Sequence, residues 1–235
     1  MDANPLSHTL HYQSYAIIVA GGSGTRMQAV VPKQFLLLNG RPVIMYTIEA
    51  FNQSAYQPKI ILVLHPNFHT YWQQLCQEHQ FTIPHQLVDG GETRFHSVKK
   101  GLELVDEDSL VAVQDAVRPL TDIAIIDMAY TQAREYGNAV VAVKSRDSVR
   151  SVRNGHSESL LRDEIYLVQT PQTFRSELLK KAYLQPFNEA FTDDASVAEK
   201  DGIVIHLTEG DYQNIKITYP EDIVIAEMLL RRRDL

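Results

Sequence analysis

The chain has 235 residues, of which 44% are hydrophobic and 22% charged, so it can bury a sizeable core and is not of the disordered type. Its formal net charge of −7 argues against a general nucleic-acid-binding protein, although one site on an acidic protein can still be basic. The single cysteine, Cys76, excludes a disulfide within the chain and fits a reducing compartment.

The N-terminal segment 1–14 is polar and lacks the basic start and apolar run of a signal peptide. No window of the sequence approaches the roughly 18 consecutive apolar residues that a membrane-spanning helix needs. We therefore expect a cytoplasmic protein that binds neither membranes nor nucleic acid. It would consist of a flexible tail at 1–14 and a single domain at 15–235.

The first half of that domain is predicted to alternate strands with helices. Apolar runs rich in β-branched residues predict buried strands at Tyr15–Ala20, Lys59–His65, Gln86–Val88 and Leu110–Gln114. Apolar residues at helical spacing predict helices that begin at Pro42 and that span Phe68–His79 and Thr93–Leu104. This alternation indicates an α/β fold with a mostly parallel sheet, and ligands bind beyond the carboxyl ends of such strands.

The second half continues the alternation and then departs from it. A helix is predicted at Asp122–Tyr136 and a strand at Asn138–Val143. Segment 144–163 is polar and contains Asn154-Gly155, a strong hairpin signal, so we interpret it as a β-arm that leaves the domain. A lone two-stranded ribbon is marginal in water, which favours pairing with a second subunit; the alternative is a disordered surface loop. The chain then returns through predicted strands at Ile165–Val168 and Ile203–Leu207 and a helix at Glu221–Leu230.

A glycine-rich segment, residues 20–24, follows the first strand, and Arg26 and Lys33 come next. Glycines after a strand let the backbone approach a polyphosphate and direct N–H groups at it. Two cations beside such a loop are what the transition state of phosphoryl transfer needs. The loop lacks the Gly-Lys-Ser/Thr ending of a P-loop and the third glycine of a dinucleotide-binding fingerprint, and a plain turn is the alternative.

Two further motifs follow later strands. Gly90-Gly91 leads into a helix start, which favours anions; the alternative is that Glu92 or Thr93 simply caps that helix. Asp115, at the end of a buried strand, suits Mg²⁺ or a ribose hydroxyl, and the alternative is an ion pair with Arg118 that braces a loop. Because these motifs and the first glycine loop all follow strands, we expect them to meet at one edge of the sheet.

Four later groups are unremarkable one by one, and each alone would be interpreted as surface: Arg162, Thr170-Pro171-Gln172, Thr192-Asp193-Asp194 and Asn214–Thr218. Within the third group, Asp193-Asp194 could equally cap a helix that begins near Ala195.

Taken together, the motifs A-G-G-x-G-x-R-M, P-K-Q-F, G-G-x-x-R-x-x-S-V, D-A-x-R-P, T-P-Q, T-D-D-A-S and N-I-K-I-T occur in this order. From Tyr15 to about Leu230 the chain resembles the 2-C-methyl-D-erythritol 4-phosphate cytidylyltransferases of the non-mevalonate isoprenoid pathway. The resemblance implies a Rossmann-like nucleotidyltransferase with a mostly parallel sheet, helices on both faces, and a protruding β-arm at about 144–163 that forms a homodimer. It also implies transfer of CMP from CTP to a sugar-alcohol phosphate, with Mg²⁺ as cofactor.

The resemblance assigns roles to individual residues. Catalytic positions of the family are matched by Arg26, Lys33, Arg162 and Lys216. Nucleotide contacts are matched by Ala20, Gly21, Gly22, Gly24, Gly91, Arg94, Ser97, Asp115, Ala116 and Arg118. Contacts to the acceptor are matched by Ser148, Thr170, Thr192 and Asp211, and Ser148 would reach across from the other subunit. The metal position falls on Asp115. Two departures keep the charge unchanged: Ser148 stands where threonine is often seen, and Val117 where alanine is common.

Several alternatives share parts of this pattern. Ribitol 5-phosphate cytidylyltransferases carry most of the same motifs and differ in acceptor rather than in chemistry. More distant alternatives are a related enzyme for another nucleotide or sugar phosphate, and a catalytically silent nucleotide-binding protein. A dinucleotide-binding oxidoreductase is disfavoured, because no acidic residue follows a second strand at the expected place and Glu49 falls within a helix.

Overall fold

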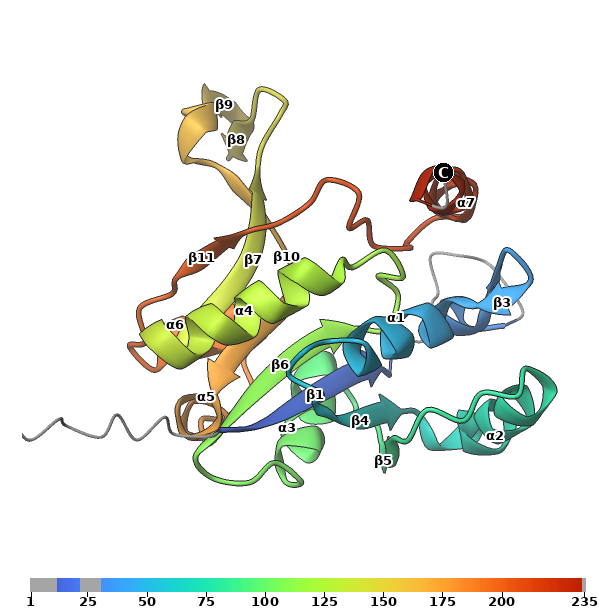
Figure 1. Ribbon diagram of the computed structural model, residues 1–235. Helices are drawn as coiled ribbons and strands as arrows, with labels where there is room; N and C mark the ends of the chain where they lie inside the picture. The colour runs from blue at the N-terminus through green and yellow to red at the C-terminus, as the bar shows by residue number, and fades with distance from the viewer. Residues whose placement is uncertain (1–11, 22–30, 234–235) are drawn as a thin grey trace, which may run out of the picture.

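The computed structural model describes residues 12–21 and 31–233, and the structural statements below concern these residues. Its centre is a seven-stranded sheet in the order β11-β7-β10-β6-β1-β4-β5 (Figure 1). The strands of the sheet are β1 (Gln13–Ala20), β4 (Lys59–Leu64), β5 (Gln86–Asp89), β6 (Ser109–Asp115), β7 (Asn138–Lys144), β10 (Tyr166–Arg175) and β11 (Leu207–Glu209). The helices are α1 (Val43–Asn52), α2 (His69–Glu78), α3 (Arg94–Leu102), α4 (Ile123–Tyr136), α5 (Ser176–Ala182), α6 (Asp194–Lys200) and α7 (Pro220–Arg233).

The sheet is mostly parallel. Strand β1 is parallel to both β4 and β6, β5 is parallel to β4, and β11 is parallel to β7. Strand β10 alone among these strands runs antiparallel to its two neighbours, β6 and β7. The predicted α/β fold with a mostly parallel sheet is therefore confirmed.

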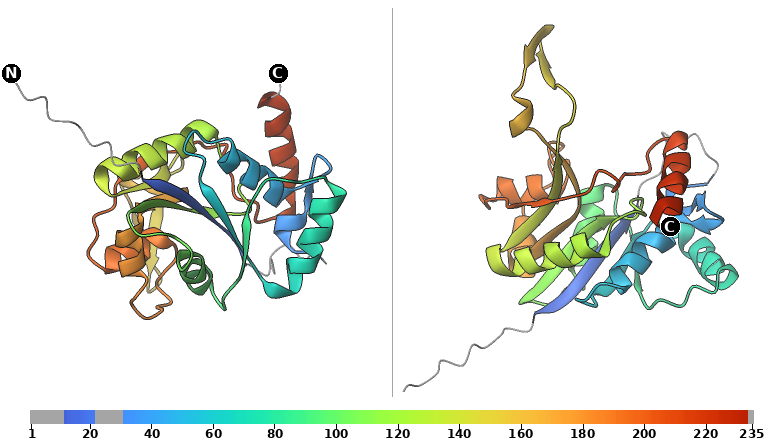
Figure 2. Two further views of the ribbon diagram at one scale, coloured as in Figure 1. Left: turned by 60° about the horizontal axis from the view of Figure 1, so that its bottom comes forward. Right: turned by 45° about the horizontal axis from the view of Figure 1, so that its top comes forward.

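Helices cover both faces of the sheet, and the alternation along β1 shows why (Figure 2). Successive strand residues point to opposite faces. Ile18 packs with residues of α1 and α4 on one face, whereas Ile17 packs with residues of α3, α5 and α6 on the other. Both side chains are fully buried, and each such burial stabilises the fold by about 1.5–3 kcal/mol. An apolar run without alternation is thus what a central strand between two helical layers requires.

A third apolar cluster joins the C-terminal helix to the segment that follows β1. Residues of α7 pack with the short hairpin of β2 (Leu37–Leu38) and β3 (Arg41–Pro42) and with the turn after β6. Ile217, just before α7, is fully buried in this cluster, and its N–H donates to the carbonyl of Val117 at 2.8 Å. This packing places the chain around residue 216 beside the end of β6.

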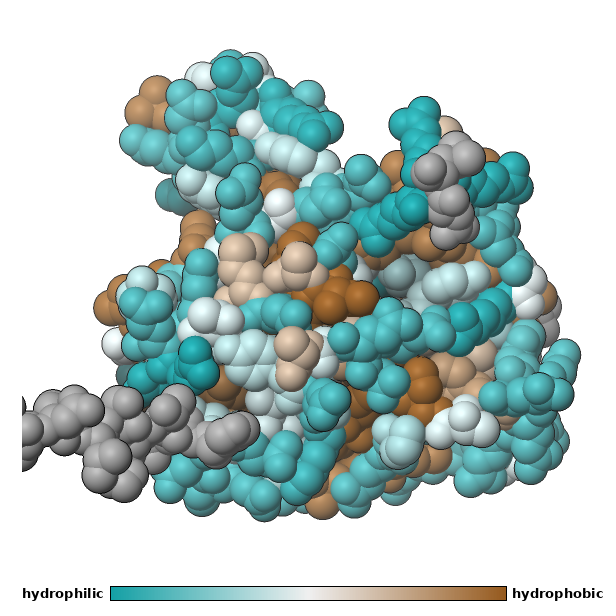
Figure 3. Space-filling view, in the orientation of Figure 1, coloured by the Kyte–Doolittle hydropathy of each residue, from teal (hydrophilic) through white to brown (hydrophobic). Residues whose placement is uncertain are grey.

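A two-stranded hairpin projects from the body of the protein where the sequence predicts an arm (Figures 1 and 2). Its strands, β8 (Arg150–Arg153) and β9 (His156–Ser159), are joined by Asn154 and Gly155, which both have positive φ, as a tight hairpin turn requires. The 3-10 helix η4 (Arg162–Glu164) lies on the return path. In the space-filling view the arm stands clear of the body and its surface is mostly hydrophilic (Figure 3).

The structure corrects the bounds of two expected strands. The strand expected at Ile203–Leu207 is displaced: β11 begins only at Leu207, because the side chain of Asn138 bonds the Val204 carbonyl and the His206 N–H in place of a strand ladder. The strand expected at Ile165–Val168 is much longer and runs to Arg175 as β10. In the part of the chain that the structure describes, no helix has the length and apolar character needed to cross a bilayer.

Candidate active site

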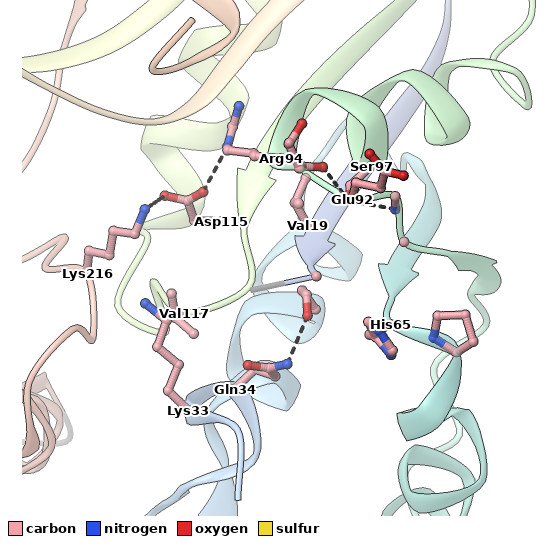
Figure 4. Close-up of a pocket in the computed structure, with 16 residues that line it drawn as sticks. Val19, Lys33, Gln34, His65, Glu92, Arg94, Ser97, Asp115, Val117 and Lys216 are labelled. Atoms are coloured by element: carbon pink, nitrogen blue, oxygen red, sulfur yellow. Dashed lines mark hydrogen bonds and ion pairs between the residues drawn. The ribbon is translucent and has the colours of Figure 1, made fainter. Parts of the chain in front are cut away.

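The carboxyl ends of the parallel strands β1, β4 and β6 open onto a cavity of about 650 Å³ (Figure 4). Eight residues with a role implied by the sequence line it: Ala20, Gly21, Lys33, Gly91, Arg94, Ser97, Asp115 and Lys216. The described start of the first glycine motif, Ala20 and Gly21, therefore meets the second glycine motif and the aspartate motif at one edge of the sheet.

Two glycines form a tight corner of this cavity. The N–H of Gly91 donates to Ser97 Oγ at 3.0 Å, and that hydroxyl donates to the Thr93 carbonyl at 3.0 Å. A Cβ at Gly21 would lie 3.0 Å from Ser97 Oγ, and a Cβ at Gly91 would lie 2.4 Å from the Cβ of His96. Side chains at these two positions would collide with Ser97 and His96, so glycine lets both loops lie close against the first turns of α3. Thr93 is also the cap of α3, since its Oγ1 accepts from the N–H of His96, as the structural alternative for this motif proposed.

Lys33 is held at the rim by its neighbour Gln34, whose importance the sequence did not reveal. Lys33 opens the 3-10 helix η2 (Lys33–Phe35). The buried Gln34 amide donates to the Ala20 carbonyl at 2.8 Å, which ties this segment to the end of β1 (Figure 4). Phe35 packs edge-on against Tyr71, with ring centroids 5.2 Å apart. The backbone of Lys33 is therefore fixed beside the first glycine motif.

Three cations surround the buried carboxylate of Asp115. Lys216 Nζ lies 2.8 Å from Oδ2, Arg118 Nε lies 3.7 Å from Oδ2, and Arg94 Nε lies 3.5 Å from Oδ1. Burial alone would raise the pKa of the Asp115 carboxyl, but the positive charges of Arg94, Lys216 and Arg118 outweigh it and hold that pKa well below its usual range. The ion pair with Arg118 that the sequence offered as an alternative is thus present, within a larger cluster. Lys33 and Lys216 extend along the same side of the cavity (Figure 4).

A second cavity, of about 230 Å³, adjoins the first. Arg94, Asp115 and Lys216 line both cavities, and Thr170 and Thr192 line only the second. Arg118, which was assigned to the nucleotide, also lines the second cavity rather than the first. Apart from Arg118, the nucleotide residues found at a cavity line the larger one, Thr170 and Thr192 of the acceptor set line the smaller one, and Arg94, Asp115 and Lys216 form the wall between them.

Asn214 connects the two sides of this shared wall, although no role was predicted for it. It is fully buried, and its side-chain amide donates to the Thr170 carbonyl at 2.9 Å. Its own carbonyl accepts from Arg118 Nη1 at 2.6 Å. The N-I-K-I-T motif contains it two residues before Lys216, but an asparagine in a polar stretch resembles a surface residue until its burial is known. Asn214 thus fixes the segment that carries Lys216.

Four assigned residues that the structure describes line neither cavity. Arg162 and Ser148 lie on the arm and are exposed. Asp211 lies near Arg233, with 3.8 Å between Oδ2 and Nη2. Ala116 is buried and donates its N–H to the Val19 carbonyl at 3.1 Å. Three further assigned positions lie outside the described residues: Arg26, Gly22 and Gly24.

The metal position assigned to Asp115 does not fit the charges around it. Mg²⁺ prefers one or two carboxylates together with water and substrate phosphates. Among residues 12–21 and 31–233, no three histidine, cysteine or acidic side chains gather as a metal site. Within these residues Asp115 belongs to no such group, and its oxygens already face three cations that would repel a divalent ion.

Removing the Asp115 carboxylate is expected to destabilise the protein in a pH-dependent way. Asp115→Asn takes a carboxylate partner away from three cations, of which Arg94 keeps its ion pair with Asp194. We expect the free energy of unfolding to fall by about 2 kcal/mol, less than for a fully buried pair because Lys216 and Arg94 are partly exposed. The pKa of Asp115 is depressed in the folded protein, so the difference from wild type should be constant from about pH 5 upward and shrink below about pH 4, where the unfolded chain takes up the proton. Urea unfolding across this range, with the exposed Asp108→Asn as control, measures it. A difference that grows on acidification would contradict the charge cluster.

The mostly parallel sheet and the cation-lined cavities at its carboxyl edge place the chain in the class of Rossmann-like nucleotidyltransferases. The family model described as 2-C-methyl-D-erythritol 4-phosphate cytidylyltransferase matches residues 14–232. The chain belongs to this family.

Individual relatives agree with the family match. The chain is 49% identical over 214 residues to the 2-C-methyl-D-erythritol 4-phosphate cytidylyltransferase of Bacteroides thetaiotaomicron. This alignment covers 91% of the chain and 98% of the relative. It is 48% identical to the protein of the same name from Azobacteroides pseudotrichonymphae, over 93% of the chain and 99% of the relative. Among solved structures, the 4-diphosphocytidyl-2C-methyl-D-erythritol synthase of Anaerococcus prevotii superposes with a TM-score of 0.81 at 28% identity, over 94% and 97% of the two chains.

Proposed function

We propose that the protein transfers the cytidylyl group of CTP to 2-C-methyl-D-erythritol 4-phosphate and releases pyrophosphate. The observation that carries this proposal is the pair of adjoining cavities whose common wall is made of Arg94, Asp115 and Lys216. Two phosphate-bearing molecules bound on the two sides of that wall would present their phosphates to each other. Bringing two anions together is the main task of such a reaction.

The transfer is a substitution at the α-phosphorus of CTP. A phosphate oxygen of the acceptor forms a bond to that phosphorus, the bond to the β-phosphate oxygen breaks, and pyrophosphate leaves in line. The acceptor oxygen is already anionic near neutral pH, so no strong general base is required. Charge builds up on the oxygens around the α-phosphorus, and fixed cations stabilise that charge.

The larger cavity suits the nucleotide. Gly21 and Gly91 line it without side chains that would cover their backbone groups, and Lys33 and Arg94 line the same cavity. In this proposal Lys33, together with Arg26 from outside the described residues, stabilises the transition state. A divalent metal stays a prediction, and because Asp115 does not fit as its ligand, no step of the reaction is assigned to it here.

The smaller cavity suits the acceptor. Thr170 and Thr192 supply hydroxyl groups there, and Lys216 supplies a cation for the acceptor phosphate. We propose that Arg162 completes this site from the arm of a second subunit. This is supported by the position of Arg162, which is exposed on the arm and lines neither cavity of its own chain. A guanidinium can grip a phosphate through two hydrogen bonds.

The acceptor can be identified by direct comparison. With CTP, we expect kcat/KM for 2-C-methyl-D-erythritol 4-phosphate to exceed that for ribitol 5-phosphate by at least about tenfold, because polar groups of a site left unpaired by the wrong acceptor carry a large penalty. Release of pyrophosphate in a coupled assay measures both values. Preference for ribitol 5-phosphate would assign the protein the other acceptor, and no release with either would reject the proposed function.

A further inference from the structure

Asp194 is a buried carboxylate outside the cavities that contacts the wall between them. It is the first residue of α6 and is fully buried. Its Oδ2 lies 2.6 Å from Nη2 of Arg94, and its Oδ1 accepts from the hydroxyl of Tyr183 at 2.6 Å. Asp194 lines neither cavity, whereas Arg94 lines both. It therefore touches the reaction site only through Arg94.

The guanidinium of Arg94 is held between two carboxylates. Its Nη2 end faces Asp194, and its Nε edge faces Asp115 at 3.5 Å. A guanidinium is planar with donors in a fixed fork, so fixing two of its nitrogens sets the plane in which the other donors lie. Without Asp194, Asp115 would be the nearest remaining carboxylate partner of Arg94, and it already faces Lys216 and Arg118. Asp194 thus opposes the electrostatic attraction of the Arg94 guanidinium toward Asp115.

The start of α6 is itself anchored to the acceptor side. Its cap, Asp193, forms a reciprocal capping box with Ser196. The side chain of Gln172 donates to Asp193 Oδ2 at 2.9 Å and accepts from the N–H of Ala195 at 2.8 Å. Gln172 follows Thr170 by two residues on β10, and both line the smaller cavity. The contact between Asp194 and Arg94 therefore links the element that lines the acceptor cavity to the helix that lines the nucleotide cavity.

We propose that Asp194 is a positioning residue for cytidylyl transfer, which orients Arg94 toward the phosphates at the junction of the two cavities. The proposal rests on the proposed function, since the phosphates are those of CTP and the acceptor. Asp194→Asn keeps the shape of the side chain and removes its charge. We expect kcat/KM for CTP to fall by about tenfold or more, because small misplacement of a charge-stabilising group is costly in rate. Tyr183→Phe removes only the other hydrogen bond to the same carboxylate and should stay within about threefold of wild type.

A second comparison separates positioning from a general structural effect. If Asp194 acts through Arg94, adding Asp194→Asn to Arg94→Gln should change kcat/KM by less than about twofold, since the two residues form one unit. This comparison also decides the matter if Asp194→Asn alone does not fold, because the double variant leaves no unpaired charge. Further loss of about fivefold or more in the Arg94→Gln background would overturn the proposal. Wild-type kinetics in a folded Asp194→Asn variant would overturn it as well.

Binding of CTP alone keeps this test independent of the acceptor. Calorimetric titration of wild type, Asp194→Asn and Tyr183→Phe with CTP should show weaker binding, by about tenfold, for Asp194→Asn alone. If wild type binds CTP but turns over neither acceptor, the proposed function fails while the titration still tests Asp194. Equal CTP affinity in all three proteins would overturn the role of Asp194 whatever the acceptor.

Discussion

Lys33→Ala is expected to lower kcat by a factor on the order of 10² or more, as the loss of one charge-stabilising donor does in other enzymes. Lys33 lines the larger cavity, and its segment is fixed there by the bond between Gln34 and the Ala20 carbonyl. An ammonium group held on a fixed backbone needs no reorganisation as charge builds up at the α-phosphorus. The loss should fall mainly on kcat rather than on KM, because the interaction strengthens in the transition state.

The fold of the Lys33→Ala variant should be intact. The anchors of the segment are the buried Gln34 and Phe35, which the substitution leaves in place. Lys200→Ala, an exposed lysine at the end of α6, serves as the matched control and should keep wild-type rates. Steady-state kinetics with both substrates varied, together with circular dichroism, measures the effect. Near-normal turnover of Lys33→Ala would remove this residue from the catalytic role.

Mixing two impaired variants should raise activity above the sum of their separate activities if the arm serves the neighbouring subunit. Lys33→Ala damages the nucleotide side of its own site, whereas Arg162→Ala damages the arm and should lower kcat/KM for the acceptor by about tenfold or more. In a mixed dimer, the site with an intact Lys33 would receive the intact arm of its partner. Random pairing then gives about a quarter of the wild-type activity, because half of the dimers carry one intact site of two.

The mixed-dimer experiment requires subunit exchange and a dimer in solution. Co-refolding of the two variants provides the exchange, and sedimentation velocity measures the dimer. The separately refolded variants, combined only in the assay, are the control and should show no more than the sum of their residual activities. A dimer whose mixtures show no recovery would place Arg162 in the site of its own chain, and a fully active monomer would reject the role of the arm.

The fold could be predicted largely because its central strands are buried on both faces. The unbroken apolar run of β1 predicts a strand buried between two helical layers. The pair Asn154-Gly155, whose residues both have positive φ, likewise predicts the hairpin turn. Helix α5 was missed, since it has seven residues and no side-chain cap at Arg175. The strand before residue 207 was misplaced because the Asn138 side chain, rather than a strand ladder, holds that segment.

The site was predictable where its residues follow strands of the parallel sheet. Gly21, Gly91 and Asp115 do so, and their meeting at one edge follows from topology. Lys216 is different: it reaches Asp115 because the segment before α7 returns beside β6, which no local pattern indicates. Gln34 and Asn214 were missed because polar side chains show their importance only once they are buried and bonded.

We propose that two phosphate-bearing molecules meet across the wall of Arg94, Asp115 and Lys216. The acceptor oxygen then attacks the α-phosphorus of CTP. Turnover of wild type with 2-C-methyl-D-erythritol 4-phosphate and CTP labelled with ³²P at either the α or the γ position tests it most directly. We expect the α label in the cytidylyl product and the γ label in pyrophosphate. Transfer of the γ label to the acceptor, or failure of the α label to leave CTP, would contradict it.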